Sequence, residues 1–190
     1  MNIKKFLYTE NTISATLING YYLWLAYEGS SNVCHLLKNS AFDPSVNYFT
    51  LNVTANKINQ MWQDSTYLFL ALNDSAKLGC RINKQNPINS QTYFTKPIGI
   101  VEEAIDLIMD TSFVYFLIPG TASGTNAKVL RFNKSATYIQ TINLTGITNA
   151  QKIDIDSSGN LWVIVNTVPP KAVKIQYISG VYSFSTYIIT

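Results

Sequence analysis

The sequence repeats itself with a period of about 45 to 46 residues, and this repeat constrains the fold more than any single motif does. Turn residues that are followed at once by an apolar run stand 45, 46 and 46 residues apart, at Asn19, Asp64, Asp110 and Asp156. Each run carries a large aromatic residue at the matching place, which is Trp24, Phe69, Tyr115 or Trp162. We expect these four aromatic residues to form the structural core of one unit that occurs four times.

A second series of residues has the same period. Its tyrosines are 45, 45 and 44 residues apart, at Tyr48, Tyr93, Tyr138 and Tyr182. The segments between turn residues are too short for amphipathic helices, which usually need ten or more residues, and they have the composition of strands. Only residues 100–109 contain several good helix formers, and there the register of the repeat favours a strand. Each repeat is therefore predicted to hold four short strands.

Four strands in a unit of about 45 residues are typical of a β-propeller blade. The second strand of each unit is continuously apolar, which is expected where neighbouring blades cover both of its faces. We therefore predict an all-β fold, a propeller or part of one, with four four-stranded antiparallel blades. A single repeat domain, 1–190, would contain blades at about 13–54, 57–97, 102–145 and 149–190.

The first residues of the chain match the outer strand of a blade. Thr54, Asn56 and Ile58 correspond to Thr9, Asn11 and Ile13 at an offset of 45 residues. Residues 2–9 are thus predicted to be a leftover outer strand whose own blade is missing. Because unpaired strand edges recruit other chains, we expect a second copy or another protein as a partner.

Residues 151–182 resemble a propeller repeat of the NHL type. The resemblance is carried by alternating apolar residues with Asp154 and Asp156, by the turn Gly159-Asn160, and by the apolar and aromatic strand that follows it. The Gly-His and Trp-Asp pairs of WD40 repeats are absent from the sequence. The resemblance implies a propeller, and NHL-type propellers include protein binders, RNA binders, lyases and lactone hydrolases. Fold alone does not choose among these functions.

Composition and charge exclude several kinds of partner. Charged residues make up 13% of the chain, and the formal net charge of +3 comes from basic residues that are mostly isolated in the sequence. No basic run can neutralise a series of phosphates, so nucleic acid is not expected. No apolar stretch reaches the roughly 18 residues of a membrane helix, so no membrane contact is expected. The many Asn, Thr and Tyr residues favour an extracellular, surface or virion-associated component over a cytoplasmic enzyme.

The residues most often used in catalysis are scarce. His35 is the only histidine, which leaves few possible Ser-His or Cys-His pairs. Cys34 and Cys80 hold corresponding places in neighbouring blades, too far apart for a disulfide, so we expect buried thiols. The run from Asp154 to Gly159 begins like a calcium loop, but its twelfth position is Val165 instead of a glutamate. It is better explained as an Asx turn.

One acidic cluster remains, consisting of Glu102, Glu103 and Asp106. Propeller lyases and lactone hydrolases place carboxylates at the start of an inner strand to hold a metal ion. Such a site needs partners from other blades, and the corresponding positions here offer only Ser14, Thr16, Asn59 and Lys152. A solvated loop end is the preferred interpretation, and a metal-dependent hydrolase or lyase is kept as an alternative.

The sequence thus favours a binding or structural module without catalysis, which serves protein–protein interaction or assembly. No catalytic residue, metal site or cofactor is predicted. A glycan-binding, lectin-like propeller is a further alternative, because exposed aromatic rings can stack on sugars, and the repeat does not assign Tyr22, Tyr27 or Trp62 to the core. Candidate binding residues are Tyr27, Glu28, Asn73, Asp74 and Asn166.

Overall fold

The computed structural model describes residues 13–19, 22–28, 33–40, 49–121 and 124–189. Over these residues the chain is all-β, without a helix, and forms four four-stranded antiparallel sheets. Within this described part, no helical segment has the length and apolar character that a membrane-spanning helix requires. The predicted outer strand at residues 2–9 lies outside the described residues.

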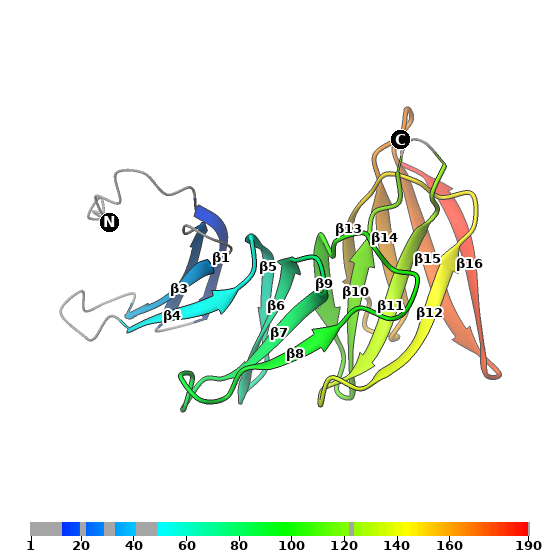
Figure 1. The fold of residues 1–190 in the computed structure, drawn as a ribbon. Helices are drawn as coiled ribbons and strands as arrows, with labels where there is room; N and C mark the ends of the chain where they lie inside the picture. Colours follow the sequence, from blue (N-terminus) through cyan, green and yellow to red (C-terminus); the bar gives the residue numbers. More distant parts are fainter. Residues whose placement is uncertain (1–12, 20–21, 29–32, 41–48, 122–123, 190) are drawn as a thin grey trace. The chain divides into compact units, whose positions relative to one another are not determined.

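Each sheet consists of four consecutive strands in chain order (Figure 1). The first sheet contains β1 (Ile13–Asn19), β2 (Tyr22–Glu28), β3 (Val33–Ser40) and β4 (Phe49–Thr54). The second contains β5 (Lys57–Gln63), β6 (Tyr67–Asn73), β7 (Lys77–Asn83) and β8 (Thr92–Thr95). The third contains β9 (Asp106–Met109), β10 (Phe113–Ile118), β11 (Ala127–Asn133) and β12 (Tyr138–Leu144). The fourth contains β13 (Ala150–Ile155), β14 (Leu161–Val165), β15 (Lys171–Ile178) and β16 (Val181–Ile188).

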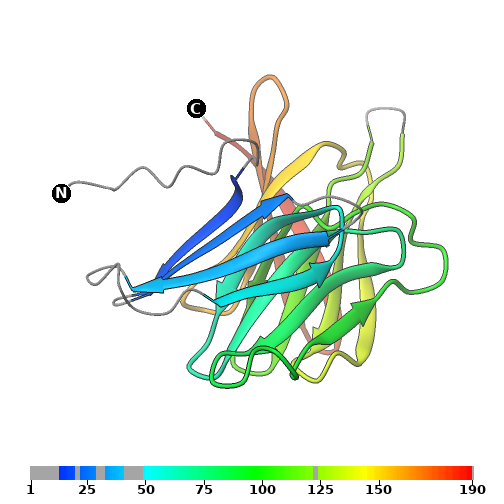
Figure 2. The same ribbon diagram turned by 60° about the vertical axis from the view of Figure 1, so that its left-hand side comes forward.

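The chain divides into two compact units, residues 1–58 and 59–190. The first unit contains the antiparallel sheet β1–β4, whose strands lie side by side in Figure 2. Its buried side chains include Trp24, Ala26, Leu36 and Val53. Strand β2 pairs with both β1 and β3, which places Trp24 opposite Leu17 on β1 and opposite Lys38 on β3.

In the second unit, the sheet β9–β12 packs between the two others. Its contact with β5–β8 is rich in aromatic rings, and the centroids of Phe94, Phe116 and Phe132 lie 5.0 to 5.7 Å apart. Its other face joins Tyr115 and Leu117 to a second core with residues of β13–β16. Strand β10 accordingly has five consecutive buried residues, as expected for a strand that is covered on both faces.

The last sheet departs from the expected pattern. We expected residues 161–164 to be covered on both faces, but β14 alternates: Leu161 and Val163 are buried, Trp162 is half-buried, and Ile164 is 39% exposed. The reason is that β9–β12 covers one face of this sheet, while in the 59–190 unit no described strand packs on the opposite face. The prediction of continuous burial was therefore wrong for this strand.

The turn residues that revealed the repeat cap the first hairpin of three sheets. One carboxylate oxygen of Asp64 accepts the backbone N–H groups of Thr66 and Tyr67, and Asp110 does the same with Ser112 and Phe113. In the last sheet Asp156 takes this role, as the next subsection describes. These are Asx turns, which reverse the chain within a few residues. A carboxylate at this position thus sets where each second strand begins.

Candidate binding pocket

A pocket of about 590 Å³ lies along the first strands of the three sheets in the 59–190 unit. It is lined by residues of β5, β9, β13 and β14 together with Asp156. Gln60, Asp106 and Lys152 occupy matching positions, 46 residues apart, on the three first strands. The period of the sequence therefore brings one side chain from each sheet to the same place.

These three side chains form a polar strip, with Asp106 at its centre. Asp106 is 3% exposed, and its Oδ2 accepts the backbone N–H of Ile153 at 3.0 Å. Lys152 Nζ lies 3.9 Å from the same oxygen, and the Gln60 side chain also hydrogen-bonds to the carboxylate. Burial raises the pKa of Asp106, while these hydrogen bonds and the charge of Lys152 oppose the shift. Asp106 thus ties the first strands of neighbouring sheets together.

Around the polar strip the pocket wall is apolar and aromatic. Trp62, which the repeat left unassigned, is 41% exposed and lines the pocket together with Leu107, Ile108 and Ile164. Such a wall can receive apolar groups, because removing apolar surface from water is favourable by about 25 cal/mol per Å². The sequence gives no signal for this role of Trp62, since the equivalent residues in the next two sheets are Ile108 and Asp154.

Trp162 forms the edge of the pocket and is held by the turn that precedes it. Its Nε1–H donates to Asp156 Oδ2 at 2.9 Å, while Asp156 Oδ1 accepts the N–H groups of Ser158 and Asn160. Gly159 sits in the turn with a φ of 80°, in the region that favours glycine. The hydrogen bond from Trp162, with those from Asn160 and Ser158, lowers the pKa of Asp156. The carboxylate is therefore used in an Asx turn.

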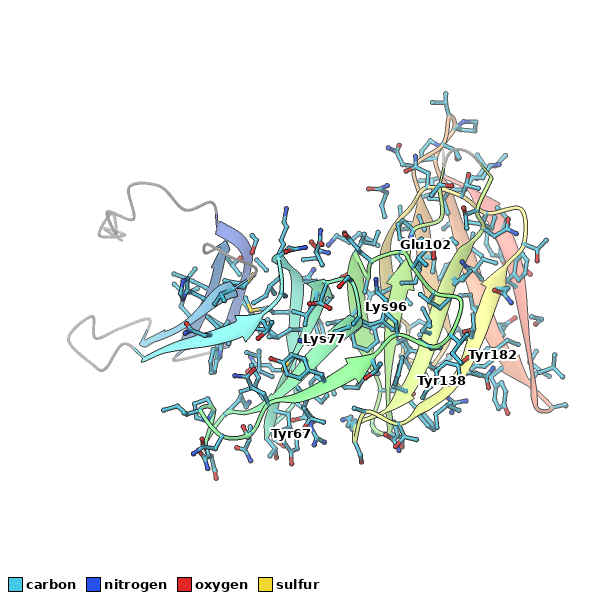
Figure 3. All side chains as sticks on the ribbon, viewed as in Figure 1. Tyr67, Lys77, Lys96, Glu102, Tyr138 and Tyr182 are labelled. Atoms are coloured by element: carbon cyan, nitrogen blue, oxygen red, sulfur yellow. The ribbon has the colours of Figure 1, made fainter. Side chains whose placement is uncertain are left out.

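The predicted acidic cluster separates into three different environments. Glu102 is labelled in Figure 3. Its Oε1 lies 3.3 Å from Lys128 Nζ. Burial alone would raise the pKa of Glu102, but hydrogen bonds, including the one from Lys128, lower it. Glu103 is exposed. Asp106 is buried in the polar strip and is not part of a solvated loop end, because it meets the backbone of β13. Among the described residues, no group of three or more His, Cys, Asp or Glu side chains is arranged to hold a metal ion.

Three of the remaining predicted binding residues, Asn73, Asp74 and Asn166, are not among the residues that line the pocket. Asn73 ends β6, and Asp74 caps the next turn by accepting the N–H groups of Ala76 and Lys77. Asn166 follows β14, and its backbone exchanges hydrogen bonds with Asn149. The backbone of Tyr27 and Glu28 ends β2, but their side chains lie outside the described residues, as does that of Tyr22.

None of the described residues that line the pocket is a histidine or a cysteine. His35 Nδ1 is 2.9 Å from Asn52 Oδ1. Cys34 and Cys80 are buried and do not form a disulfide. The Cys34 thiol contacts the carbonyl oxygen of Ala55 at 3.2 Å, and burial raises the pKa of the Cys80 thiol to about 12. A thiol with so high a pKa is a poor nucleophile at neutral pH.

No family model matches the chain. No curated protein matches it either. Solved structures do resemble it. A protein from Bacteroides uniformis that is assigned as a 6-phosphogluconolactonase has a TM-score of 0.64 at 11% identity, over 92% of this chain and 56% of that protein. YCF48, bound to a D1 peptide, has a TM-score of 0.58 at 11% identity, over 91% of this chain and 52% of YCF48.

A third similar structure comes from a study of two prolyl endopeptidases, with a TM-score of 0.60 at 9% identity, over 90% of this chain and 25% of that one. The chain thus spans about half the length of the first two structures. At such low identity, the likeness shows the fold alone. Together with the four four-stranded antiparallel sheets, it confirms the predicted fold class, a β-propeller or part of one.

Proposed function

We propose that the chain is a non-catalytic binding module that takes apolar side chains of a partner protein into the pocket along β5, β9 and β13. One observation carries this proposal: a pocket of about 590 Å³ has apolar and aromatic side chains beside the polar strip, with the carboxylates of Asp154 and Asp156 also in its lining. Ligand sites in proteins typically have volumes of about 300 to 1,000 Å³ and a mainly apolar lining with a few polar groups. Trp62 would be the main anchor for the partner.

The polar groups in the pocket favour binding over catalysis. Asp106 is engaged with the backbone of Ile153 and with Gln60, and Asp156 is engaged in its turn. A general base needs to reach a proton of the substrate, and a nucleophile needs a base beside it. No serine, cysteine or histidine is among the described lining residues, and the exposed Asp154 accepts the N–H of Ile155. We therefore infer that the pocket holds its ligand without transforming it.

A peptide selection on the immobilised full chain tests the proposal. Peptides enriched from a random twelve-residue library are measured by fluorescence anisotropy against the wild type, Trp62→Ala and a control, Val101→Ala. Val101 is 80% exposed and does not line the pocket. We expect peptides with an aromatic or branched aliphatic anchor, whose affinity falls roughly tenfold or more with Trp62→Ala and stays unchanged with Val101→Ala. Equal binding to all three proteins would contradict the proposal.

A metal-dependent hydrolase or lyase is the alternative suggested by the acidic cluster and by the lactonase and peptidase names among similar structures. Hydrolysis of 6-phosphogluconolactone and of a prolyl peptide should be assayed with added divalent ions. The variant Glu102→Gln/Glu103→Gln removes the two carboxylates and leaves Asp106 with the N–H of Ile153. Turnover by the wild type that this variant abolishes would establish the alternative and refute a purely binding role.

A glycan is the second candidate ligand, and the exposed ring of Trp62 favours it. An indole of this kind can stack on the apolar face of a sugar ring. Titration of the wild type with oligosaccharides should then change the tryptophan fluorescence, and Trp62→Phe should keep more of the affinity than Trp62→Ala. A fluorescence signal that Trp62→Ala leaves intact would exclude this site for glycans.

We also infer that residues 151–182 form a repeat of the NHL type. The support is the turn in which Asp156 caps the backbone of Ser158 and Asn160 while Gly159 has a positive φ. The aromatic residue of the next strand, Trp162, completes the pattern by donating to the same aspartate.

A further inference from the structure

The sheet β13–β16 has one face that is uncovered within the 59–190 unit and carries apolar side chains on β14, β15 and β16. The strand register places Trp162 opposite Lys174, Ile164 opposite Ala172, and Ala172 opposite Tyr187, so these side chains share one face. We call this face, made of Trp162, Ile164, Ala172, Lys174 and Tyr187, the outer face. The rings of Trp162 and Tyr187 are in contact, with centroids 5.7 Å apart, and Tyr187 is 48% exposed.

The matching residues of the two preceding sheets are buried between sheets. Trp162 corresponds to Tyr115 and Phe69, while Ile164 corresponds to Leu117 and Ala71. Those four residues are at most 6% exposed, because each pair packs against the next sheet along the chain. The outer face therefore corresponds to one side of the two sheet–sheet interfaces in the 59–190 unit.

The two sheet–sheet interfaces within the 59–190 unit also show which residues pack against such a face. The following sheet contributes alternate apolar residues of its second strand, such as Val114 and Phe116 against Phe69. Leu161 and Val163 contribute in the same way against Tyr115. A surface that covers the outer face should thus present two apolar side chains, two residues apart, on the second strand of a sheet.

The sheet β1–β4 presents such a pair. Leu23 and Leu25 on β2 flank Trp24, as Leu68 and Leu70 flank Phe69. The equivalent pairs in the third and fourth sheets are Val114 with Phe116 and Leu161 with Val163. The residues of these three pairs in β6, β10 and β14 are at most 2% exposed. Leu23 and Leu25 are only partly buried, so their face of β1–β4 still has apolar surface to cover.

We propose that the outer face of one chain binds the Leu23 and Leu25 face of a second copy, head to tail. Two copies can satisfy both faces at once through two identical contacts, which closes the assembly. Together they contribute eight four-stranded sheets, twice the four of one chain, within the four to eight blades of typical propellers. This assembly goes beyond the proposed binding in the pocket, and it shares Trp162 and Ile164 with the pocket lining, so a second copy on the outer face would cover that side of the pocket.

The outer face has the composition of an interface core with a polar rim. The apolar side chains of Trp162, Ile164 and Ala172 adjoin the charged side chain of Lys174. On β13 the exposed residues Asp154 and Lys152 lie opposite Trp162 and Ile164 and complete the charged rim. The equivalent cations already sit at sheet contacts over aromatic rings: the guanidinium of Arg81 lies 4.5 Å from the Tyr67 ring centroid, and that of Arg131 lies 3.5 Å from Phe113. Lys174 Nζ lies 5.7 Å from the ring centroid of Trp162, which is its partner in the strand register. A cation here is therefore compatible with docking.

Sedimentation velocity of the full chain between 1 and about 100 µM tests the proposal. The wild type should sediment as a dimer of about 43 kDa, twice the chain mass of 21.3 kDa. Ile164→Lys and Leu25→Lys should each raise the dissociation constant roughly 30-fold or more, because a charge is placed in the centre of the contact. The control Ile98→Lys changes a fully exposed residue outside the outer face and should remain dimeric.

Mixing the two interface variants identifies which faces meet. Ile164→Lys keeps an intact Leu25 face and Leu25→Lys keeps an intact outer face, so an equimolar mixture should dimerise through one contact. A Leu25→Lys variant that is still fully dimeric alone would contradict the proposal by showing that two outer faces meet. A monomeric wild type at 100 µM would overturn it in favour of another occupant, either the chain's own first sheet or a different protein. If Leu25→Lys loses its β-sheet circular dichroism, Leu23→Gln takes its place.

Discussion

At the residue scale, the aspartate that begins the first hairpin of each sheet in the 59–190 unit also reaches a second group. Asp110 Oδ2 accepts the hydroxyl of Tyr115 at 2.8 Å, and Asp156 Oδ2 accepts Nε1–H of Trp162 at 2.9 Å. In both sheets the turn residue therefore hydrogen-bonds to the repeated aromatic residue of the second strand. Phe69 offers no such donor, and Asp64 instead lies 3.2 Å from Lys134 of the next sheet. This hydrogen bond explains why an aspartate precedes Tyr115 and Trp162, and it does not explain the pairing of Asp64 with Phe69.

Replacing Asp156 by Asn tests that link. The Asn side chain can still accept in the Asx turn but presents an amide to Trp162 Nε1–H, so the free energy of unfolding should fall at pH 7. The pKa of Asp156 is lowered in the folded chain, by the hydrogen bond from Trp162 first. The ionised carboxylate therefore stabilises the fold above the unfolded pKa of about 3.9, and this contribution is lost as the pH falls through the folded pKa.

Urea denaturation at pH 7, 5 and 3 measures the effect. The difference between the wild type and Asp156→Asn should be largest at pH 7 and should narrow below about pH 4. The exposed Asp154, replaced in Asp154→Asn, is the matched control. A difference that stays constant over this pH range would mean that the charge of Asp156 plays no part.

Gly79 is required by a close approach between two sheets. A Cβ atom at this position would meet the carbonyl oxygen of Leu70 and would lie 2.5 Å from Cε1 of Phe116. Gly79→Ala should therefore reduce the free energy of unfolding by about 1 to 3 kcal/mol. Thermal or urea denaturation is the measurement, and a change of less than about 0.3 kcal/mol would contradict this account. The double variant with Phe116→Leu should lose less than the sum of the two single variants.

At the scale of elements, the sequence predicts where strands and turns lie, but it predicts poorly whether another sheet covers a given face of a strand. Turn residues such as Asp64 and Asp110 mark where the chain reverses, and the short apolar segments between turn residues are the strands. Four strands per repeat could therefore be predicted. Residues 100–109, where a helix competed, contain β9. The apolar run 161–164 reads like 114–117, yet Ile164 is exposed, because a local pattern does not show whether another sheet lies beyond the strand.

Replacing the repeated aromatic residues by alanine tests this difference in burial, because the loss of unfolding free energy depends on how completely each side chain is covered. Phe69→Ala and Trp24→Ala remove side chains that are at most 1% exposed and should each cost on the order of 3 to 5 kcal/mol. Trp162→Ala should cost clearly less under conditions where the chain is monomeric, since Trp162 is only half-buried. Chemical denaturation of the three variants is the test. Equal losses at all three positions would show that Trp162 is as fully covered as the others.

At the scale of the whole molecule, the pocket depends on groups that are far apart in the sequence. Asp106 was grouped with Glu102 and Glu103 because it is near them in sequence, but its partner is the N–H of Ile153 in another sheet. Trp62 became a pocket residue only through the packing of three sheets. The repeat predicts that matching residues come together, and it does not reveal what each one contacts. The candidate site was therefore found mostly from the structure.

The central claim is that the pocket along the first strands is the binding site. The most direct measurement is the change of backbone amide NMR shifts when a selected peptide is added to the isotope-labelled full chain. We predict that the perturbed amides cluster on β5, β9 and β13, around Gln60, Leu107 and Ile153, and that Trp62→Ala abolishes the changes. Perturbations confined to the last strands β8, β12 and β16 would contradict the account.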